Sequence, residues 1–171
     1  MISLQVLFYI FLVLFAVIGM IRGFRKEIVV TVAGILSLFI VEAVTPKIFG
    51  GLDGMKSFYI NMIILFGCSF FGYQTPSFQR FNSRFERENF LDLLLGGVVG
   101  ALNGYIIFSS AWFFLARAGY PFAWISAPDA SSEAGRAAIA LLENALPNVL
   151  TGSWLYVALA AAVLIVIAVI I

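Results

Sequence analysis

The chain has 171 residues; 63% of them are hydrophobic, only 11% carry a charge, and the net charge is +1. Soluble domains are about 45–50% apolar and about 25% charged, so this chain lacks the charged side chains that a water-exposed surface requires. We therefore expect an integral membrane protein of the all-α class, and no nucleic-acid partner, because the chain has no strong positive field. Histidine, the commonest metal ligand, is absent, so no metal, haem or other cofactor is expected.

Five apolar segments reach or approach the length that spans a bilayer, which is about 20 residues. These segments are Leu4–Ile21, Ile28–Val44, Phe58–Tyr73, Leu93–Ala116 and Val149–Ile171. The positive charges follow the first segment and do not precede it, which predicts a retained transmembrane helix and not a signal peptide. The third segment is short and partly polar, so it either spans the bilayer or forms a tilted or re-entrant element. The sequence thus predicts four or five transmembrane helices.

Six of the ten basic residues lie in two connections that share one side of the membrane in this topology. They are Arg22, Arg25 and Lys26 after the first segment, and Arg80, Arg84 and Arg87 after the third. Because cytoplasmic loops are enriched in lysine and arginine, this side is expected to be cytoplasmic. The N-terminus is then outside, and the C-terminus is in the cytoplasm if the fifth segment spans. At the inner face, the six basic side chains are expected to bind anionic lipid headgroups.

Two connections have the pattern of amphipathic helices at the membrane interface. In residues 74–89, Phe78, Phe81 and Phe85 fall on one side of a helix and the three arginines on the other. This pattern indicates a membrane anchor or, alternatively, a lipid-sensing or partner-docking element. In residues 119–148, aromatic residues that suit the interface come first. Asp129 is then expected to N-cap an amphipathic helix that runs to about Leu146 and that Pro147 helps to end.

Glycines are concentrated in the fourth segment, in LLGGVVGALNG (94–104), although each one costs a helix interior about 1 kcal/mol relative to alanine. They recur about every four residues and so share a helix face, which comprises Gly96, Gly97, Gly100 and Gly104. In a bilayer, small residues let two helix backbones approach closely. We expect a packing groove, or glycine zipper, that receives Gly19 and Gly23 of the first segment. A second copy of the chain is the alternative partner, and a glycine-lined pore is a third interpretation.

Three polar residues within the apolar segments or at their ends are candidates for a function, because such groups are costly in lipid. Glu42 either reaches the headgroups from the outer end of the second segment or has a functional role. Asp92 suits the N-terminus of the fourth helix and could pair with the basic residues of the first connection. Asn103 is expected to bond another helix, with a pore or substrate role as the alternative. The sequence has no catalytic set of the Ser/His/Asp or Cys/His kind and no phosphate-binding loop, so no enzyme is expected.

Two stretches, GMIRGFRKEIVVTVAG (19–34) and LDLLLGGVVGALNGYIIFSSAWFFL (91–115), resemble the two signatures of the colicin V production protein family. The resemblance covers about residues 1–118, and the matching positions are Arg22, Gly23, Phe24, Glu27, Asp92, Gly97, Gly100 and Gly104. It implies a bacterial inner-membrane protein with about four spanning helices and a role in colicin V export or envelope homeostasis. Residues 1–118 are then the family-like membrane domain, 119–148 an extracytoplasmic segment, and 149–171 an additional transmembrane helix.

Three functions are compatible with these features. The first is a non-enzymatic inner-membrane protein of the colicin V production type. The second is an accessory or scaffold subunit of a larger membrane complex, with other membrane proteins or a second copy of the chain as partners. The third is a small channel or transporter in which Asn103 and the glycines line the path.

Overall fold

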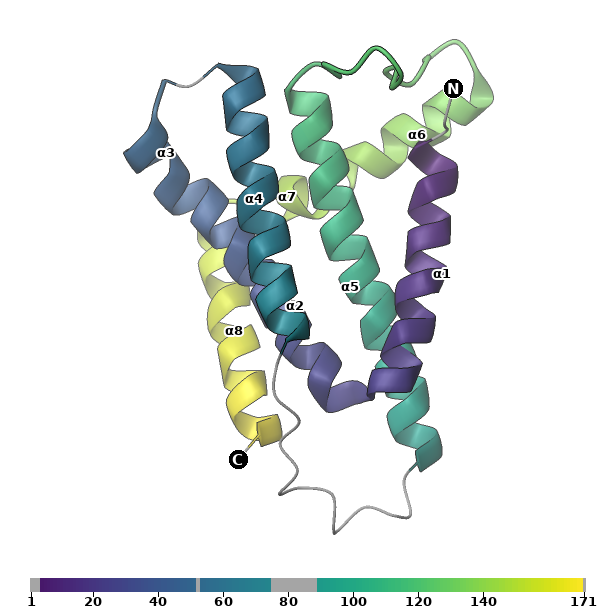
Figure 1. Ribbon diagram of the computed structural model, residues 1–171, viewed down its shortest axis with the longest axis vertical. Helices are drawn as coiled ribbons and strands as arrows, with labels where there is room; N and C mark the ends of the chain where they lie inside the picture. The colour runs from purple at the N-terminus through teal and green to yellow at the C-terminus, as the bar shows by residue number, and fades with distance from the viewer. Residues whose placement is uncertain (1–3, 52, 75–88, 171) are drawn as a thin grey trace.

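A computed structural model describes residues 4–51, 53–74 and 89–170, and every element within these ranges is helical (Figure 1). The predicted interfacial helix of Phe78, Phe81 and Phe85 lies outside the described residues. The basic residues Arg80, Arg84 and Arg87 lie outside them as well.

Four helices are long and apolar enough to cross a membrane, which confirms an all-α polytopic membrane protein. Helix α1 comprises Leu4–Arg22, and α4 comprises Gly54–Tyr73. Helix α5, Asn89–Arg117, is the longest, and its apolar span begins at Phe90. The remaining span, Phe24–Phe49, is continuous but irregular, since α2 (Phe24–Phe39) leads into a π-helical turn, η1 (Ile40–Val44), and then into α3 (Thr45–Phe49). Helix α8, Ser153–Ile170, contains a shorter apolar stretch.

Helix α4 is longer than the apolar pattern of the third segment indicates. The helix begins one turn earlier, at Gly54, because the Asp53 side chain caps it by accepting a hydrogen bond from the Lys56 backbone N–H at 2.8 Å. That hydrogen bond also holds the pKa of the exposed Asp53 carboxyl below its usual value. With the added turn, α4 has 20 residues, the length that a membrane-spanning helix needs.

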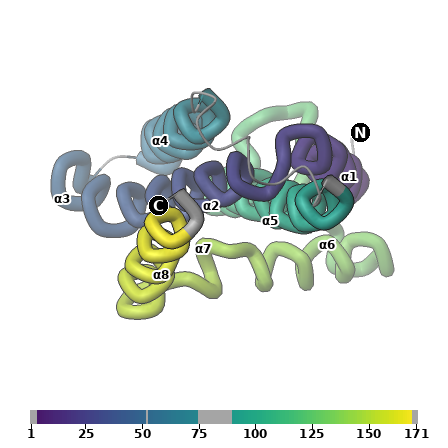
Figure 2. Tube along the Cα trace, turned by 90° about the horizontal axis from the view of Figure 1, so that it is seen from below, coloured from purple at the N-terminus to yellow at the C-terminus, as the bar shows by residue number. Residues whose placement is uncertain are grey.

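Helix α5 lies at the centre of the bundle, between α1 on one side and α2 on the other (Figure 2). Helix α4 packs on α2 and α5, and α8 packs on α2. We call the end of the bundle that carries Gly23, between α1 and α2, the turn end. The opposite end, which carries residues 118–132, is the loop end.

The segment after α5 differs from the predicted single helix. Helix α6 begins at Glu133, because Ser132 is its N-cap and accepts a hydrogen bond from the Gly135 N–H at 3.0 Å. The Asp129 side chain instead accepts from the backbone N–H of Ser131 at 2.9 Å, so the prediction for Asp129 was wrong. Helix α6 ends at Glu143, and a short α7, Leu146–Val149, follows it. The proline at 147 lies in the first turn of α7, where its missing N–H leaves no hydrogen bond unmade.

Candidate functional site: a buried carboxylate that joins four helices

The Glu27 side chain is fully buried, although it lies in the first turn of α2, only four residues after the Gly23 turn. Its carboxylate forms an ion pair with Arg22, the last residue of α1, with Nη1 and Oε1 2.6 Å apart. The other carboxylate oxygen accepts a hydrogen bond from Nδ2 of Asn103, on α5, at 2.7 Å. It also accepts one from the hydroxyl of Tyr73, at the end of α4, at 3.4 Å. One carboxylate thus contacts side chains from three other helices.

The partners of Glu27 are also bonded to one another. Asn103 Nδ2 donates to the Glu27 carbonyl at 3.0 Å, and Asn103 Oδ1 accepts from the Thr31 hydroxyl at 2.7 Å. The second guanidinium nitrogen of Arg22 donates to the Tyr73 carbonyl at 3.0 Å, and the guanidinium carbon lies 4.3 Å from the centre of the Tyr73 ring. We refer to these five residues, Arg22, Glu27, Thr31, Tyr73 and Asn103, as the Glu27 cluster. Because every member bonds another, the cluster is a closed network.

The turn that delivers Arg22 and Glu27 to the cluster requires glycine at position 23. Gly23 has φ 84°, in the left-handed region that side chains disfavour. A Cβ there would also lie 3.3 Å from the Asp92 side-chain carboxyl carbon. Asp92, at the start of α5, accepts a hydrogen bond from the Phe24 N–H at 3.1 Å. One carboxylate therefore lies at the N-terminal ends of both α2 and α5, where a negative charge is stabilised.

The chemistry of the Glu27 cluster is that of a structural ion pair. A buried pair is stable only when further hydrogen bonds satisfy both ions, and here Asn103 and Tyr73 supply them. Loss of Arg22 would leave the buried Glu27 carboxylate without its counter-ion, at a cost of about 3–5 kcal/mol. Within the described ranges, no three histidine, cysteine or acidic side chains come together to hold a metal ion.

The glycines of α5 lie where α1 crosses it, and the first of them, Gly96, lies against the Gly23 turn itself. A Cβ on Gly100 would lie 2.8 Å from Cα of Gly19, and a Cβ on Gly96 would lie 3.1 Å from Cα of Gly23. These distances are too short for a side chain, so the two helix backbones are in direct contact.

The remaining glycines receive side chains of α1. Gly97 lies against Met20, and a Cβ on Gly104 would lie 2.8 Å from Cβ of Phe15. Helix α1 therefore packs on the glycine face of α5, the face on which the sequence predicts a groove.

The other polar and basic candidates lie apart from the Glu27 cluster. Glu42, in the π-helical turn, is exposed, and its carboxylate accepts a hydrogen bond from the Gly152 N–H at 2.7 Å, just before α8. Arg25 and Lys26 are exposed in the first turn of α2. Their binding to anionic headgroups, like any association with other membrane proteins, stays a prediction.

Three members of the Glu27 cluster were not among the predicted site residues: Glu27 itself, Thr31 and Tyr73. In the sequence, Glu27 stands out only as part of the family signature. One signal was available, because Glu27 and Thr31 are four residues apart and therefore share a face of α2 with the apolar core. Tyr73 had no such signal, since only the antiparallel packing of α4 on α2 brings it to the turn end.

The fold and the Glu27 cluster define a polytopic α-helical membrane protein in which a buried ion pair joins four helices near one end of the bundle. More particularly, the chain belongs to the colicin V production protein family, whose family model matches residues 4–133. The match confirms the resemblance of the two signatures and extends beyond residue 118 to the first residue of α6. A search of curated proteins and a search of solved structures found no match.

Proposed function

We propose that this chain is a non-enzymatic protein of the bacterial inner membrane that acts in envelope homeostasis or toxin export. The observation that carries the proposal is the family match over residues 4–133. The orientation we propose has the turn end in the cytoplasm. The basic residues Arg22, Arg25 and Lys26 support it, because lysine and arginine are enriched in cytoplasmic connections.

The Glu27 cluster supports a structural role within this function and not a chemical one. An intramembrane carboxylate is by default a candidate for transport or proton transfer. Here, however, the carboxylate is fully buried and takes its hydrogen bonds from Asn103, Tyr73 and Arg22. We infer that the cluster fixes the geometry of the turn end. The bundle then presents one defined surface to its partners in the envelope.

A deletion and complementation experiment tests the proposed function. The gene is deleted in its own bacterium, and the strain is assayed for growth in anionic detergent, for survival of osmotic shock and for secretion of a peptide toxin. We expect a defect in at least one assay that the wild-type gene restores. Wild-type behaviour of the deletion strain in all three would contradict the proposal.

Complementation with variants then tests the part played by the Glu27 cluster. Glu27→Gln removes the charge and retains the side-chain shape, and we expect it to complement poorly. Gly67→Ala is the control, because a Cβ at Gly67 meets nothing within 4 Å. If Glu27→Gln complements as fully as Gly67→Ala at equal protein levels, the ion pair has no part in the function.

Transport is the second candidate, and the position of Asn103 in the middle of an apolar span is the observation that favours it. The purified protein is reconstituted into liposomes that enclose a pH-sensitive dye, and proton leakage is measured after an external pH jump. Transport along this path predicts a leak that Asn103→Leu abolishes. A leak equal to that of protein-free liposomes would rule out proton conduction by this route.

A further inference from the structure

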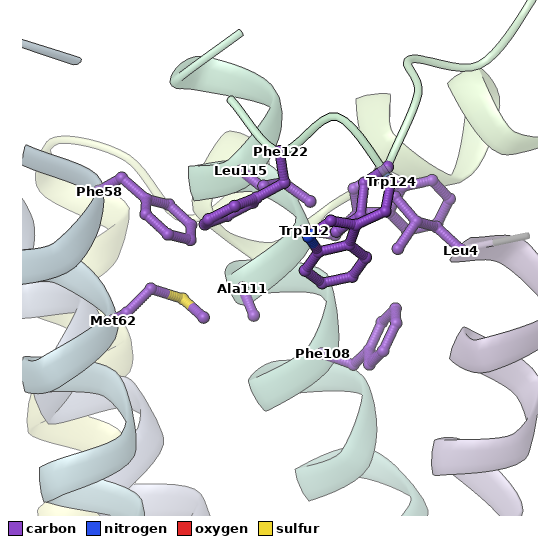
Figure 3. Close-up of a pocket in the computed structure, with 10 residues that line it drawn as sticks. Leu4, Phe58, Met62, Phe108, Ala111, Trp112, Leu115, Phe122 and Trp124 are labelled. Carbon is purple, nitrogen blue, oxygen red and sulfur yellow. The ribbon is translucent and has the colours of Figure 1, made fainter. Parts of the chain in front are cut away.

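An apolar cavity lies at the loop end of the bundle, between α1 and α4, with α5 as its back wall (Figure 3). Its volume is about 210 Å³. Phe58 and Met62 form the wall on α4, and Leu4 forms the wall on α1. Ala111 and Trp112 form the back, where the small side chain of Ala111 leaves much of the space.

The roof of the cavity is the segment that follows α5. This segment turns back at once, because Gly119 and Tyr120 both adopt left-handed conformations, with φ 75° and 53°. The Tyr120 N–H donates to the Leu115 carbonyl at 3.1 Å and fixes the reversal. The turn brings Phe122 and Trp124 over the cavity (Figure 3). Gly119 adopts its conformation at no steric cost, whereas the left-handed conformation of Tyr120 is strained, and this strained turn closes an aromatic roof over an open space.

The lining of the cavity favours a hydrocarbon and not water. The polar group of its most buried aromatic residue, the indole N–H of Trp112, is already donated to the Tyr120 hydroxyl at 3.2 Å. Almost all of the remaining lining surface is apolar. A buried water needs two to four polar partners, and an apolar cavity of about 150 Å³ is known to stay dry and to bind benzene. The cavity has room for several carbon atoms and offers no polar partners for water.

The opening of the cavity identifies the source of the hydrocarbon. Its two side walls, α1 and α4, make little direct contact with each other, so helix packing does not close the cavity between them. Both helices are long and apolar enough to span a membrane, and both expose large apolar side chains, among them Val13 on α1 and Ile63 on α4. Acyl chains would therefore cover the outer faces of the two helices that form the side walls of the cavity.

We propose that the cavity is a binding site for one acyl chain of a membrane lipid, taken from the leaflet that borders the loop end. The site does not depend on the proposed function in the envelope. The chain enters between α1 and α4, lies against Ala111 and Trp112, and ends beneath Phe122 and Trp124.

Quenching of tryptophan fluorescence by brominated acyl chains tests the site, because the chain has three tryptophans in different surroundings. Trp112 is only 3% exposed and lines the cavity, whereas Trp154, on α8, is 71% exposed. Two variants each retain one of them, with phenylalanine at the other two positions. Both are reconstituted into phosphatidylcholine vesicles that contain rising fractions of phosphatidylcholine with a dibrominated acyl chain. We expect quenching of Trp112 that rises in proportion to the brominated fraction, as one site filled by one chain requires, while quenching of the exposed Trp154, which several lipids surround, rises more steeply and levels off earlier.

A cavity-filling substitution separates the site from the surrounding lipid. Ala111→Phe in the Trp112 variant should abolish the quenching of Trp112, and Ala160→Phe should leave it unchanged, because Ala160 is exposed on α8. Ala111→Val, a smaller change, should give a partial loss and serves if the phenylalanine variant does not fold. The proposal is overturned if Trp112 is not quenched, or if Ala111→Phe and Ala111→Val leave its quenching unchanged. Quenching that disappears when the protein-to-lipid ratio is raised would also overturn it, since a second copy of the chain would then cover the cavity.

Discussion

Replacing Gly100 with alanine tests whether α1 and α5 depend on direct backbone contact. The new Cβ would lie 2.8 Å from Cα and 3.1 Å from N of Gly19, and neither backbone atom can rotate away as a side chain would. Overpacking of this kind costs about 1–3 kcal/mol. Alanine also favours the helix by about 1 kcal/mol relative to glycine, which hides part of the loss. The steric term must therefore be separated from the change in helix propensity.

Gly67→Ala in α4 provides the matched control, since its Cβ meets nothing within 4 Å. Both substitutions gain the same helix propensity, so the difference between them isolates the steric term of about 1–3 kcal/mol. The assay is thermal unfolding of the purified protein in mild detergent, followed by circular dichroism. We expect Gly67→Ala to melt at or above the wild-type temperature and Gly100→Ala to melt below it. Equal melting temperatures for the two variants would show that the two backbones are not in contact at Gly100.

Three further predictions concern the carboxylates at the helix ends. Glu27→Ala should lower the free energy of unfolding by about 3–5 kcal/mol, because it takes the counter-ion from the partly buried Arg22 and the shared acceptor from Asn103 and Tyr73. Chemical unfolding in detergent measures this loss, and a change below about 1 kcal/mol would refute the ion-pair account. Asp92→Ala should lower the free energy of unfolding by about 0.5–2 kcal/mol, because it removes the acceptor of the Phe24 N–H. Asp92→Asn retains an acceptor oxygen and should retain most of the stability. Equal losses for the two variants in the same unfolding assay would exclude capping as the role of Asp92. A hydrogen bond from the Lys56 backbone N–H holds the pKa of Asp53 below its ordinary value of 3.8. The stability that the ionised carboxylate adds is therefore complete above that pH and is lost as the pH falls through the lower folded-state value. The difference in melting temperature between wild type and Asp53→Asn should accordingly shrink below pH 3.8, and a difference independent of pH would contradict this assignment.

Much of the architecture could be predicted because a bilayer imposes strong rules on sequence. A span needs a long apolar run, and the scarcity of charge in this chain marks where the runs begin and end. Those rules locate all four long helices. They miss the first turn of α4, where Asp53 caps the helix and Lys56 interrupts the apolar pattern within it. The same rules are weak in the segment after α5, where hydrogen bonds between neighbouring side chains and backbone decide which residue caps a helix. That is why Ser132, and not Asp129, begins α6.

The sequence by itself therefore determined the membrane class, the long apolar helices and the family, since each rests on local composition or on a short run of residues. Only the tertiary structure decided what the polar residues do. Asn103 and Glu27 are 76 positions apart, and they meet because α2 and α5 pack side by side. The aromatic cavity also depends on tertiary packing, because its walls come from three helices and its roof from a reversal of the chain. Local sequence specifies the helices, but which buried groups meet depends on the register of helices distant in the chain.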